Sequence, residues 1–293
     1  MADRRILIAM AHPDDESFGL GGLIAKYVDA GVDVYLICST NGDAGTIDPE
    51  LLEGYESKAA LRLAELDCAA EKLGFKEVFK LGYKDSGMMG APENNDPESS
   101  WSVWNHHPAE LVQRVTEIIR QVKPQVVITF NRYGGYGHPD HIAIQRATTE
   151  AFHKAGDAAY TDSALPPYQP QKLYYTSIPR YFVQIGIWRA RMKRQDPRKM
   201  GRNNDIDLIA IMQNAEPPTV RVDIQNYMQA WTEANACHVS QGGGRMTITP
   251  PWLRMLLGTR QGLTRIFPAP VRKGIDEADL FTAVTLDEEV PVP

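Results

Sequence analysis

Short apolar runs alternate with longer amphipathic segments along the first 180 residues of the chain. Apolar runs bounded by turn residues predict buried strands, and apolar residues at helical spacing predict helices. The predicted strands cover 5–10, 32–39, 78–81, 126–130 and 173–178, and the predicted helices cover 18–30, 55–73, 108–122 and 139–155. This alternation predicts an α/β fold, with a Rossmann-like, mostly parallel sheet and helices on both of its faces.

Three parts of the chain depart from this alternation. Two long segments, 40–54 and 84–107, predict loops, and long loops in compact domains often carry function. Beyond residue 180 the pattern becomes irregular and is punctuated by Pro and Gly. We therefore expect a Rossmann-like catalytic core over residues 1–180. A less regular C-terminal subdomain over 181–293 is expected to belong to the same compact domain and to contribute to the substrate pocket.

Composition narrows the class of protein. The 293 residues are 43% hydrophobic and 23% charged, which is typical of a globular protein. A formal net charge of −6 argues against general nucleic-acid binding. The basic stretch 189–202 could form a surface for an anionic substrate or a partner, but such a run is more typical of a solvated helix face. With no signal-peptide pattern and no apolar run of about 20 residues, we expect a cytoplasmic protein without a membrane partner. The oligomeric state stays open, with a homo-oligomer as one alternative.

The cysteines give no sign of a disulfide framework. Cys38, Cys68 and Cys237 are far apart in the sequence, their number is odd, and they form no CxxC pair. We therefore expect three reduced and mostly buried thiols.

Polar residues gather where two predicted strands end. Residues 11–16 read AHPDDE after the first strand, and residues 134–141 read GGYGHPDH after the 126–130 strand. In open α/β sheets, ligands bind beyond the carboxyl ends of the strands, where the strand order switches. If these two strands are neighbours, the two clusters face each other across one crevice. The first strand lacks a following GxGxxG, so a dinucleotide site is not supported.

The residue types in these clusters fit a metal site. His12, Asp15 and His141 supply two imidazoles and one carboxylate, which in zinc hydrolases leave one position open for water. The same set of ligands suits Fe²⁺, so zinc is the expected cofactor and Fe²⁺ stays an alternative. Taken alone, either cluster also fits a turn and a helix N-cap, but the occurrence of both favours a metal centre.

The remaining charged residues of the clusters fit acid–base chemistry. Asp14, next to a metal ligand, is placed to take a proton from a metal-activated water. His138 is placed to stabilise an oxyanion or to protonate a leaving amine. Asp140 is placed to hold His138 in one tautomer and to favour its protonated form. His238, by contrast, is only a weak candidate for a site residue.

At the two clusters the sequence resembles the PIG-L/LmbE family of zinc-dependent N-deacetylases, and in particular its mycothiol-pathway branch. The resemblance implies hydrolysis of a linear amide bond, with removal of an acetyl group from an N-acetylglucosamine-type amino sugar. It also implies roles for the matching residues: His12, Asp15 and His141 as zinc ligands, Asp14 as general base, His138 with its partner Asp140 at the tetrahedral intermediate, and Tyr136 on a mobile loop at the oxyanion.

Two further segments extend the resemblance. RLAEL at 62–66 is similar to a helix whose arginine contacts substrate, and DSGMMG at 85–90 is similar to a loop whose aspartate binds sugar hydroxyls. The resemblance therefore implies substrate contacts from Arg62, Asp85 and Met88. From the residue types alone, Arg62 fits a solvated helix position equally well, and Asp85 fits a turn.

The resemblance covers about residues 4–155 and is weak beyond them. Residues 238–241 loosely fit an H-x-x-Q stretch of the family, and Trp231 stands near the position of an expected lysine. This divergence leaves several functions open. An amidase acting on a mycothiol-like thiol conjugate would use the same residues. A metal-dependent phosphoesterase would need two metals about 3.5–4 Å apart, and a non-catalytic sugar-binding protein would leave Asp14 and His138 unexplained.

Overall fold

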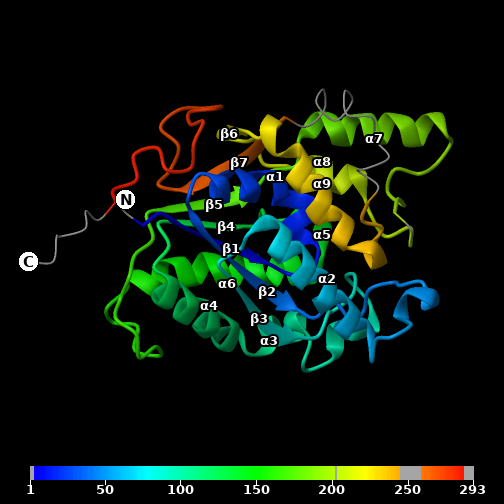
Figure 1. Ribbon diagram of the computed structural model, residues 1–293. Helices are drawn as coiled ribbons and strands as arrows, with labels where there is room; N and C mark the ends of the chain where they lie inside the picture. The colour runs from blue at the N-terminus through cyan, green and yellow to red at the C-terminus, as the bar shows by residue number, and fades with distance from the viewer. Residues whose placement is uncertain (1–2, 202, 245–258, 287–293) are drawn as a thin grey trace, which may run out of the picture.

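A seven-stranded sheet forms the centre of the computed structural model, which describes residues 3–201, 203–244 and 259–286 (Figure 1). The strands are β1 (Arg5–Met10), β2 (Asp33–Thr40), β3 (Glu77–Tyr83), β4 (Val126–Thr129), β5 (Lys172–Thr176), β6 (Val220–Asp223) and β7 (Arg260–Phe267). Their spatial order is β3-β2-β1-β4-β5-β7-β6. β1 to β5 pair in parallel, whereas β7 runs antiparallel to β5 and to β6. The predicted mostly parallel sheet is confirmed.

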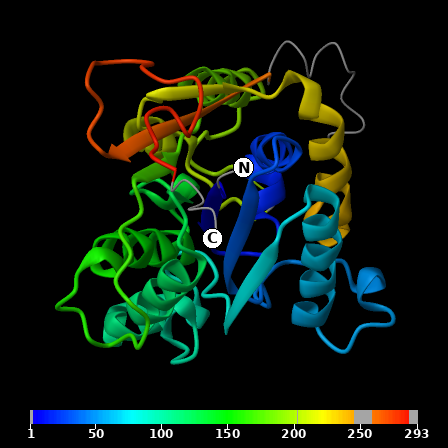
Figure 2. The same ribbon diagram turned by 60° about the vertical axis from the view of Figure 1, so that its left-hand side comes forward.

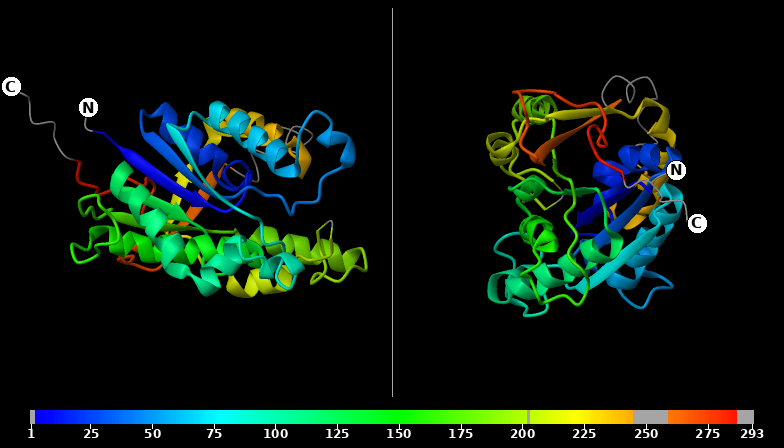
Figure 3. Two further views of the ribbon diagram at one scale, coloured as in Figure 1. Left: turned by 90° about the horizontal axis from the view of Figure 1, so that it is seen from below. Right: turned by 90° about the vertical axis from the view of Figure 1, so that its left-hand side faces the viewer.

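Helices cover both faces of this sheet, as predicted. The α-helices among the described residues are α1 (Asp15–Asp29), α2 (Lys58–Leu73), α3 (Ser100–His106), α4 (Pro108–Val122), α5 (Gly134–Gly137), α6 (Pro139–Gly156), α7 (Arg180–Met192), α8 (Leu208–Asn214) and α9 (Met228–Cys237). Of these, α5 is a single short turn. Helices α1, α2 and α9 pack together on one face, and α3, α4 and α6 pack together on the other (Figure 3, left). Burial from both sides explains why β1 and β4 read as unbroken apolar runs.

The observed ends of three helices show where the local sequence determines a helix boundary. The range of α4 agrees with the prediction, because Pro108 begins the helix and a left-handed residue ends it. Helix α2 begins at Lys58 rather than 55, because the Ser57 side chain accepts a hydrogen bond from the Ala60 N–H. Helix α1 begins at Asp15, inside the first polar cluster, rather than at 18. Its first turn therefore carries site residues.

The C-terminal region completes the sheet and covers one face of it. β6 and β7 extend the sheet beyond β5, while α9 packs against both α1 and α2. In the described part of the basic stretch, α7 exposes Arg189 and Arg191 to solvent, as expected for a solvated face; Arg202 lies outside the described residues. The helices among the described residues are too short or too polar to span a lipid bilayer.

The expectation of three reduced thiols is wrong for two of the cysteines. Cys68 on α2 and Cys237 at the end of α9 form a disulfide, and Cys38 is a buried free thiol. Figure 2 shows α2 and α9 side by side, which brings together two residues 169 positions apart. The spacing of cysteines in a sequence cannot reveal such a contact, because it depends on how the C-terminal region packs on the sheet.

Candidate metal and acid–base site

The two polar clusters meet at the carboxyl ends of β1 and β4. These strands are paired in parallel, so the segments that follow them leave the sheet at the same edge. His12 follows β1 directly, and His141 lies in the first turns of α6. Nδ1 of His12 and Nε2 of His141 are 3.0 Å apart, and both rings are buried. The arrangement of the clusters across one crevice is confirmed.

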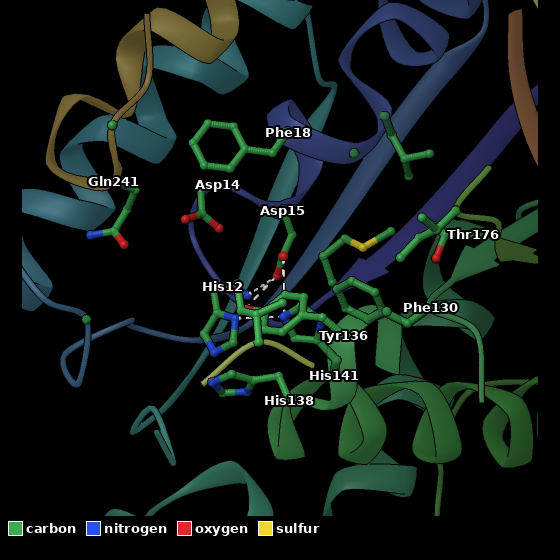
Figure 4. A pocket seen from close by; sticks show the side chains of 18 of the residues that line it. His12, Asp14, Asp15, Phe18, Phe130, Tyr136, His138, His141, Thr176 and Gln241 are labelled. Carbon is green, nitrogen blue, oxygen red and sulfur yellow. Dashed lines mark hydrogen bonds and ion pairs between the residues drawn. The ribbon is translucent and has the colours of Figure 1, made fainter. Parts of the chain in front are cut away.

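Asp15 completes a triangle of side chains with these two histidines. Its Oδ2 lies 3.4 Å from Nδ1 of His12, and its Oδ1 lies 3.3 Å from Nε2 of His141. Atoms bound to tetrahedral zinc at about 2.0–2.1 Å would lie about 3.3 Å from one another. Each of the two nitrogens thus faces its own oxygen of Asp15 at about this separation, and the three side chains lie close enough together to hold one metal ion through two imidazoles and one carboxylate. Figure 4 shows the three side chains directed toward one point of the pocket.

The charges around the triangle favour a cation. Burial lowers the pKa of His12, but the neighbouring carboxylates of Asp85, Asp140 and Asp15 outweigh it and raise that pKa well above its ordinary value. Burial lowers the pKa of His141 to about 4. Burial raises the pKa of Asp15, but the two histidines outweigh it and hold that pKa well below its usual range. A carboxylate between two imidazoles is thus ionised at neutral pH, as a metal ligand must be.

Asp140 is bonded to His12 rather than to His138. Its Oδ2 lies 3.2 Å from Nε2 of His12 and accepts a 2.8 Å hydrogen bond from the Ser86 N–H, and the Ser86 hydroxyl donates to Oδ1. The same oxygen is 3.9 Å from Nδ1 of His138. A carboxylate on the far nitrogen of a metal-binding imidazole orients that ring and fixes its tautomer.

His138 is held by backbone instead. Its Nδ1 accepts a 3.2 Å hydrogen bond from the Asp140 N–H, which leaves Nε2 as the protonated nitrogen of the neutral ring. Burial and the charge on His12 lower the pKa of His138 to about 3, although Asp140 raises it. The ring is therefore neutral at neutral pH, with Nε2 as a hydrogen-bond donor.

Asp14 lies in the wall of the same pocket. Figure 4 shows it between Phe18 and His12. Arg62 donates to its Oδ2 at 2.9 Å and is itself held by the carbonyls of Pro13 and Gly42. Burial raises the pKa of Asp14 to about 7, although the positive charge of Arg62 lowers it. Asp14 therefore has the affinity for a proton that a general base at neutral pH requires.

The other predicted residues lie around the same pocket. Oδ1 of Asp85 is 3.6 Å from Nε2 of His12 and 3.9 Å from Nε2 of His138. Met88 lines the pocket, as does Tyr136, whose ring stands edge-on to His141 with centroids 5.0 Å apart. Burial raises the pKa of Tyr136, which keeps its hydroxyl protonated.

The glycines of the second cluster are needed for its backbone conformation. Gly134, Gly135 and Gly137 have φ values of 67°, 68° and 94°, which side chains with a Cβ rarely adopt. A Cβ on Gly134 would also come within 3.0 Å of the Cβ of His141. The glycines therefore let the chain turn tightly after β4 and bring His141 to the edge of the sheet.

The pocket extends far beyond these groups. Its volume is about 990 Å³, and residues from the C-terminal region form much of its lining. Several of the lining residues carry no motif in the sequence: Phe18, Ile178, Tyr181, Phe182 and Ile206. The available signal for Phe18 is an aromatic residue two positions after the AHPDDE segment.

The comparisons with known proteins agree with the motifs. The model of the PIG-L family, described as GlcNAc-PI de-N-acetylase, matches residues 7–152. The 1D-myo-inositol 2-acetamido-2-deoxy-α-D-glucopyranoside deacetylase of Thermomonospora curvata is 36% identical over 248 residues, covering 82% of this chain and 81% of the relative. This chain belongs to the PIG-L family. The resemblance drawn from the AHPDDE and GGYGHPDH segments is confirmed.

Solved structures similar to this PIG-L protein show the fold alone. The N,N′-diacetylchitobiose deacetylase of Pyrococcus horikoshii has a TM-score of 0.60 at 23% identity, with 90% of this chain and 84% of that chain covered. The 4-carboxy-2-hydroxymuconate hydratase GalB of Pseudomonas putida also has a TM-score of 0.60, at 18% identity, with 93% and 100% covered. Since a deacetylase and a hydratase share the fold, the reaction must be argued from the site.

Proposed function

We propose that this PIG-L N-deacetylase depends on zinc and removes the acetyl group from N-acetylglucosamine joined to inositol. The observation that carries the proposal is the triangle of His12, Asp15 and His141, with atoms 3.0–3.4 Å apart beside Asp14. The substrate is taken from relatives such as the Thermomonospora curvata deacetylase, which is named for that compound.

The three residues of the triangle would hold the metal. Zinc bound there supplies Lewis acidity, which polarises the acetyl carbonyl and makes an adjacent water a stronger acid. Fe²⁺ is the alternative ion, because it accepts the same two imidazoles and one carboxylate. The carboxylate of Asp140 on Nε2 of His12 keeps Nδ1 of that ring turned toward the ion.

Asp14 is proposed as the general base. Its carboxylate lies next to the ligand triangle, and the bond from Arg62 to Oδ2 fixes its orientation. It would take the proton from water as the oxygen attacks the acetyl carbon. The same carboxylic acid can then return that proton to the departing amine.

His138 and Tyr136 are proposed to stabilise the negative charge that develops on the acetyl oxygen. His138 is neutral, and its Nε2–H is the free donor because Nδ1 is occupied by the Asp140 N–H. The protonated Tyr136 hydroxyl provides a second donor from the same loop. Donors already in place where charge appears lower the barrier without reorganisation.

Arg62, Asp85 and Met88 are proposed to contact the sugar. Asp85 offers acceptor oxygens to sugar hydroxyls, and the nearest guanidinium nitrogen of Arg62 is 3.8 Å from it. Paired carboxylate and guanidinium groups bind polyhydroxylated ligands through directed hydrogen bonds. Met88 would pack against an apolar face of the ring.

A second candidate is hydrolysis of a larger amide, as in a mycothiol-like thiol conjugate. The observation that favours it is the cavity of about 990 Å³, whose outer part is lined by the partly exposed Phe18, Tyr181 and Phe182. These aromatic side chains offer an apolar surface that a small polar pseudodisaccharide does not need.

One assay tests both candidates. Zinc-loaded protein is incubated with N-acetylglucosaminyl-inositol, N-acetylglucosamine alone and an amide-linked thiol conjugate, and the free amine is measured. We expect the inositol compound to give the highest kcat/KM. A higher kcat/KM for the conjugate would favour the amidase, and no free amine from any of the three would refute both.

A further inference from the structure

The backbone of Asp14 has a conformation that an L-amino acid rarely adopts. Its φ is 152° and its ψ is −24°, although it is not a glycine. Such a conformation is unfavourable for a residue with a Cβ and persists only where its surroundings hold it in place. Asp14 stands at the N-cap of α1, but its side chain makes no cap hydrogen bond. Its carboxylate instead reaches Arg62 in the pocket wall.

Glu16 is the side chain that holds this backbone. The Asp14 N–H donates to its Oε2 at 3.1 Å. Its other oxygen, Oε1, accepts from the Ser17 hydroxyl at 2.6 Å and lies 2.8 Å from Nε2 of His238. The Glu16 side chain is fully buried. A buried carboxylate needs such partners, because burying an unpaired charge is strongly unfavourable.

His238 reaches Glu16 from the C-terminal region, 222 residues away. It is fully buried, and among the described residues its Nδ1 has no hydrogen-bond partner, so its ring bonds through Nε2 to Glu16 and Ser17. The polar contacts of this ring are thus directed at the group that holds Asp14.

The segment that carries His238 is fixed on both sides. The disulfide of Cys237 anchors it to α2, and Ser240 donates from its N–H and its hydroxyl to Glu65 of the same helix, each at 2.7 Å. An imidazole on so constrained a segment is well suited to determine where Glu16 lies.

We propose that His238 and Glu16 form a positioning pair, which holds the Asp14 backbone in the conformation that turns its carboxylate toward the ligand triangle. The pair acts through Asp14 and does not touch the reacting atoms. The proposal rests on the proposed role of Asp14 as the general base. A group misplaced by about 1 Å can lose about a hundredfold in rate, so the backbone geometry of a base matters even when the ligands are intact.

The test compares substitutions of equal bulk at residue 238. His238→Gln keeps a donor near the position of Nε2, whereas His238→Leu keeps the volume and removes the donor. We expect His238→Leu to lower kcat about tenfold to a hundredfold, with KM and bound zinc within about twofold of wild type. His238→Gln should retain at least a third of kcat. His106→Leu, at an exposed histidine, is the matched control and should leave kcat unchanged.

A second variant keeps the test valid if His238→Leu does not fold. Glu16→Met keeps a side chain of similar length but removes the acceptor of the Asp14 N–H, and we expect the same loss of kcat. The double variant should lose no more than either single one, because the two residues act as a unit. Additive losses, or kcat values that follow thermal stability alone, would contradict the pair.

A crystal structure of metal-free Glu16→Met protein gives a measure that does not depend on turnover. We expect the φ of Asp14 to relax to a negative value. If the wild-type protein hydrolyses no amide, the proposed function is refuted. The positioning pair would still be supported if the φ of Asp14 relaxes in Glu16→Met protein. An unchanged φ together with an unchanged kcat would overturn the positioning role while leaving the deacetylase proposal intact.

Discussion

The two walls of the pocket are built in different ways. On one wall, the proposed ligands and acid–base groups follow β1 and β4 within a few residues, so short segments of sequence carry them. On the other wall, the residues after α9 contribute Ser240 and Gln241, and His238 is buried behind them. His238 and Ser240 are placed by contacts with the distant side chains of Glu16 and Glu65. The first wall is proposed to perform the chemistry. The second holds the first in position and bounds the space for substrate.

This difference predicts that changes on the two walls have unequal effects on turnover. Removal of the metal should have the largest effect on turnover, because the ion held by His12, Asp15 and His141 is proposed to supply the Lewis acidity for the reaction. Dialysis against a chelator should abolish amine release, and one equivalent of zinc per chain should restore it, as measured by metal analysis beside the assay. Full turnover by metal-free protein would refute a metal-dependent reaction, and two ions per chain would favour a phosphoesterase.

Substitution of the proposed base should come next. Asp14→Asn keeps the size of the side chain but cannot accept the proton, so we expect kcat to fall about 10²- to 10⁴-fold. Bound zinc should stay near one per chain, because Asp14 is not part of the ligand triangle. Asp67→Asn, which breaks an ion pair with Lys80 at the surface, is the control and should leave kcat unchanged. Wild-type kcat in Asp14→Asn would mean that another group is the base.

Loss of the proposed oxyanion donor should cost less. His138→Ala removes one of two donors, so we expect kcat to fall about 10²- to 10³-fold while KM changes little. His138→Gln should recover part of the loss, since its amide donates from a similar position. If KM rises and kcat stays unchanged, His138 contributes to substrate binding rather than to the developing charge.

The smallest effect on turnover is expected on the opposite wall. Cys68→Ser breaks the disulfide to Cys237 and should lower the free energy of unfolding by about 2–4 kcal/mol, while kcat falls less than about twofold. Cys237→Ser and the double variant should show the same loss of stability by urea denaturation. A double variant that loses the sum of the two single effects would show that the thiols contribute separately.

The same contrast explains how much could be predicted from the sequence. The strands and the long helices up to β5, and the meeting of His12 with His141, follow from local apolar patterns and the order of strands in a doubly wound sheet. The short helix α3, by contrast, lies in the segment 84–107 that was predicted to be a loop. The residue types at the strand ends then indicate the chemistry. For these features, residues close in sequence carry the information.

Other features depend on contacts that the sequence does not display. The partner of Asp140 was expected to be His138, but the carboxylate lies closer to His12, because both oxygens are drawn to Ser86 in a loop 54 residues away. The burial of His238 against Glu16 requires α9 to pack over α1. The disulfide depends on the same packing. No local periodicity encodes any of these contacts.

The link between Cys68 and Cys237 has a consequence for a chain that is cut. A single proteolytic nick in the segment between α6 and β5, residues 157–171, would separate the two histidines and the aspartate of the triangle from the C-terminal wall as two peptides. Because the disulfide bridges the cut, the two peptides would remain joined. They would migrate as one band on a denaturing gel without reductant and as two bands with it, and the nicked molecule would retain its complete pocket.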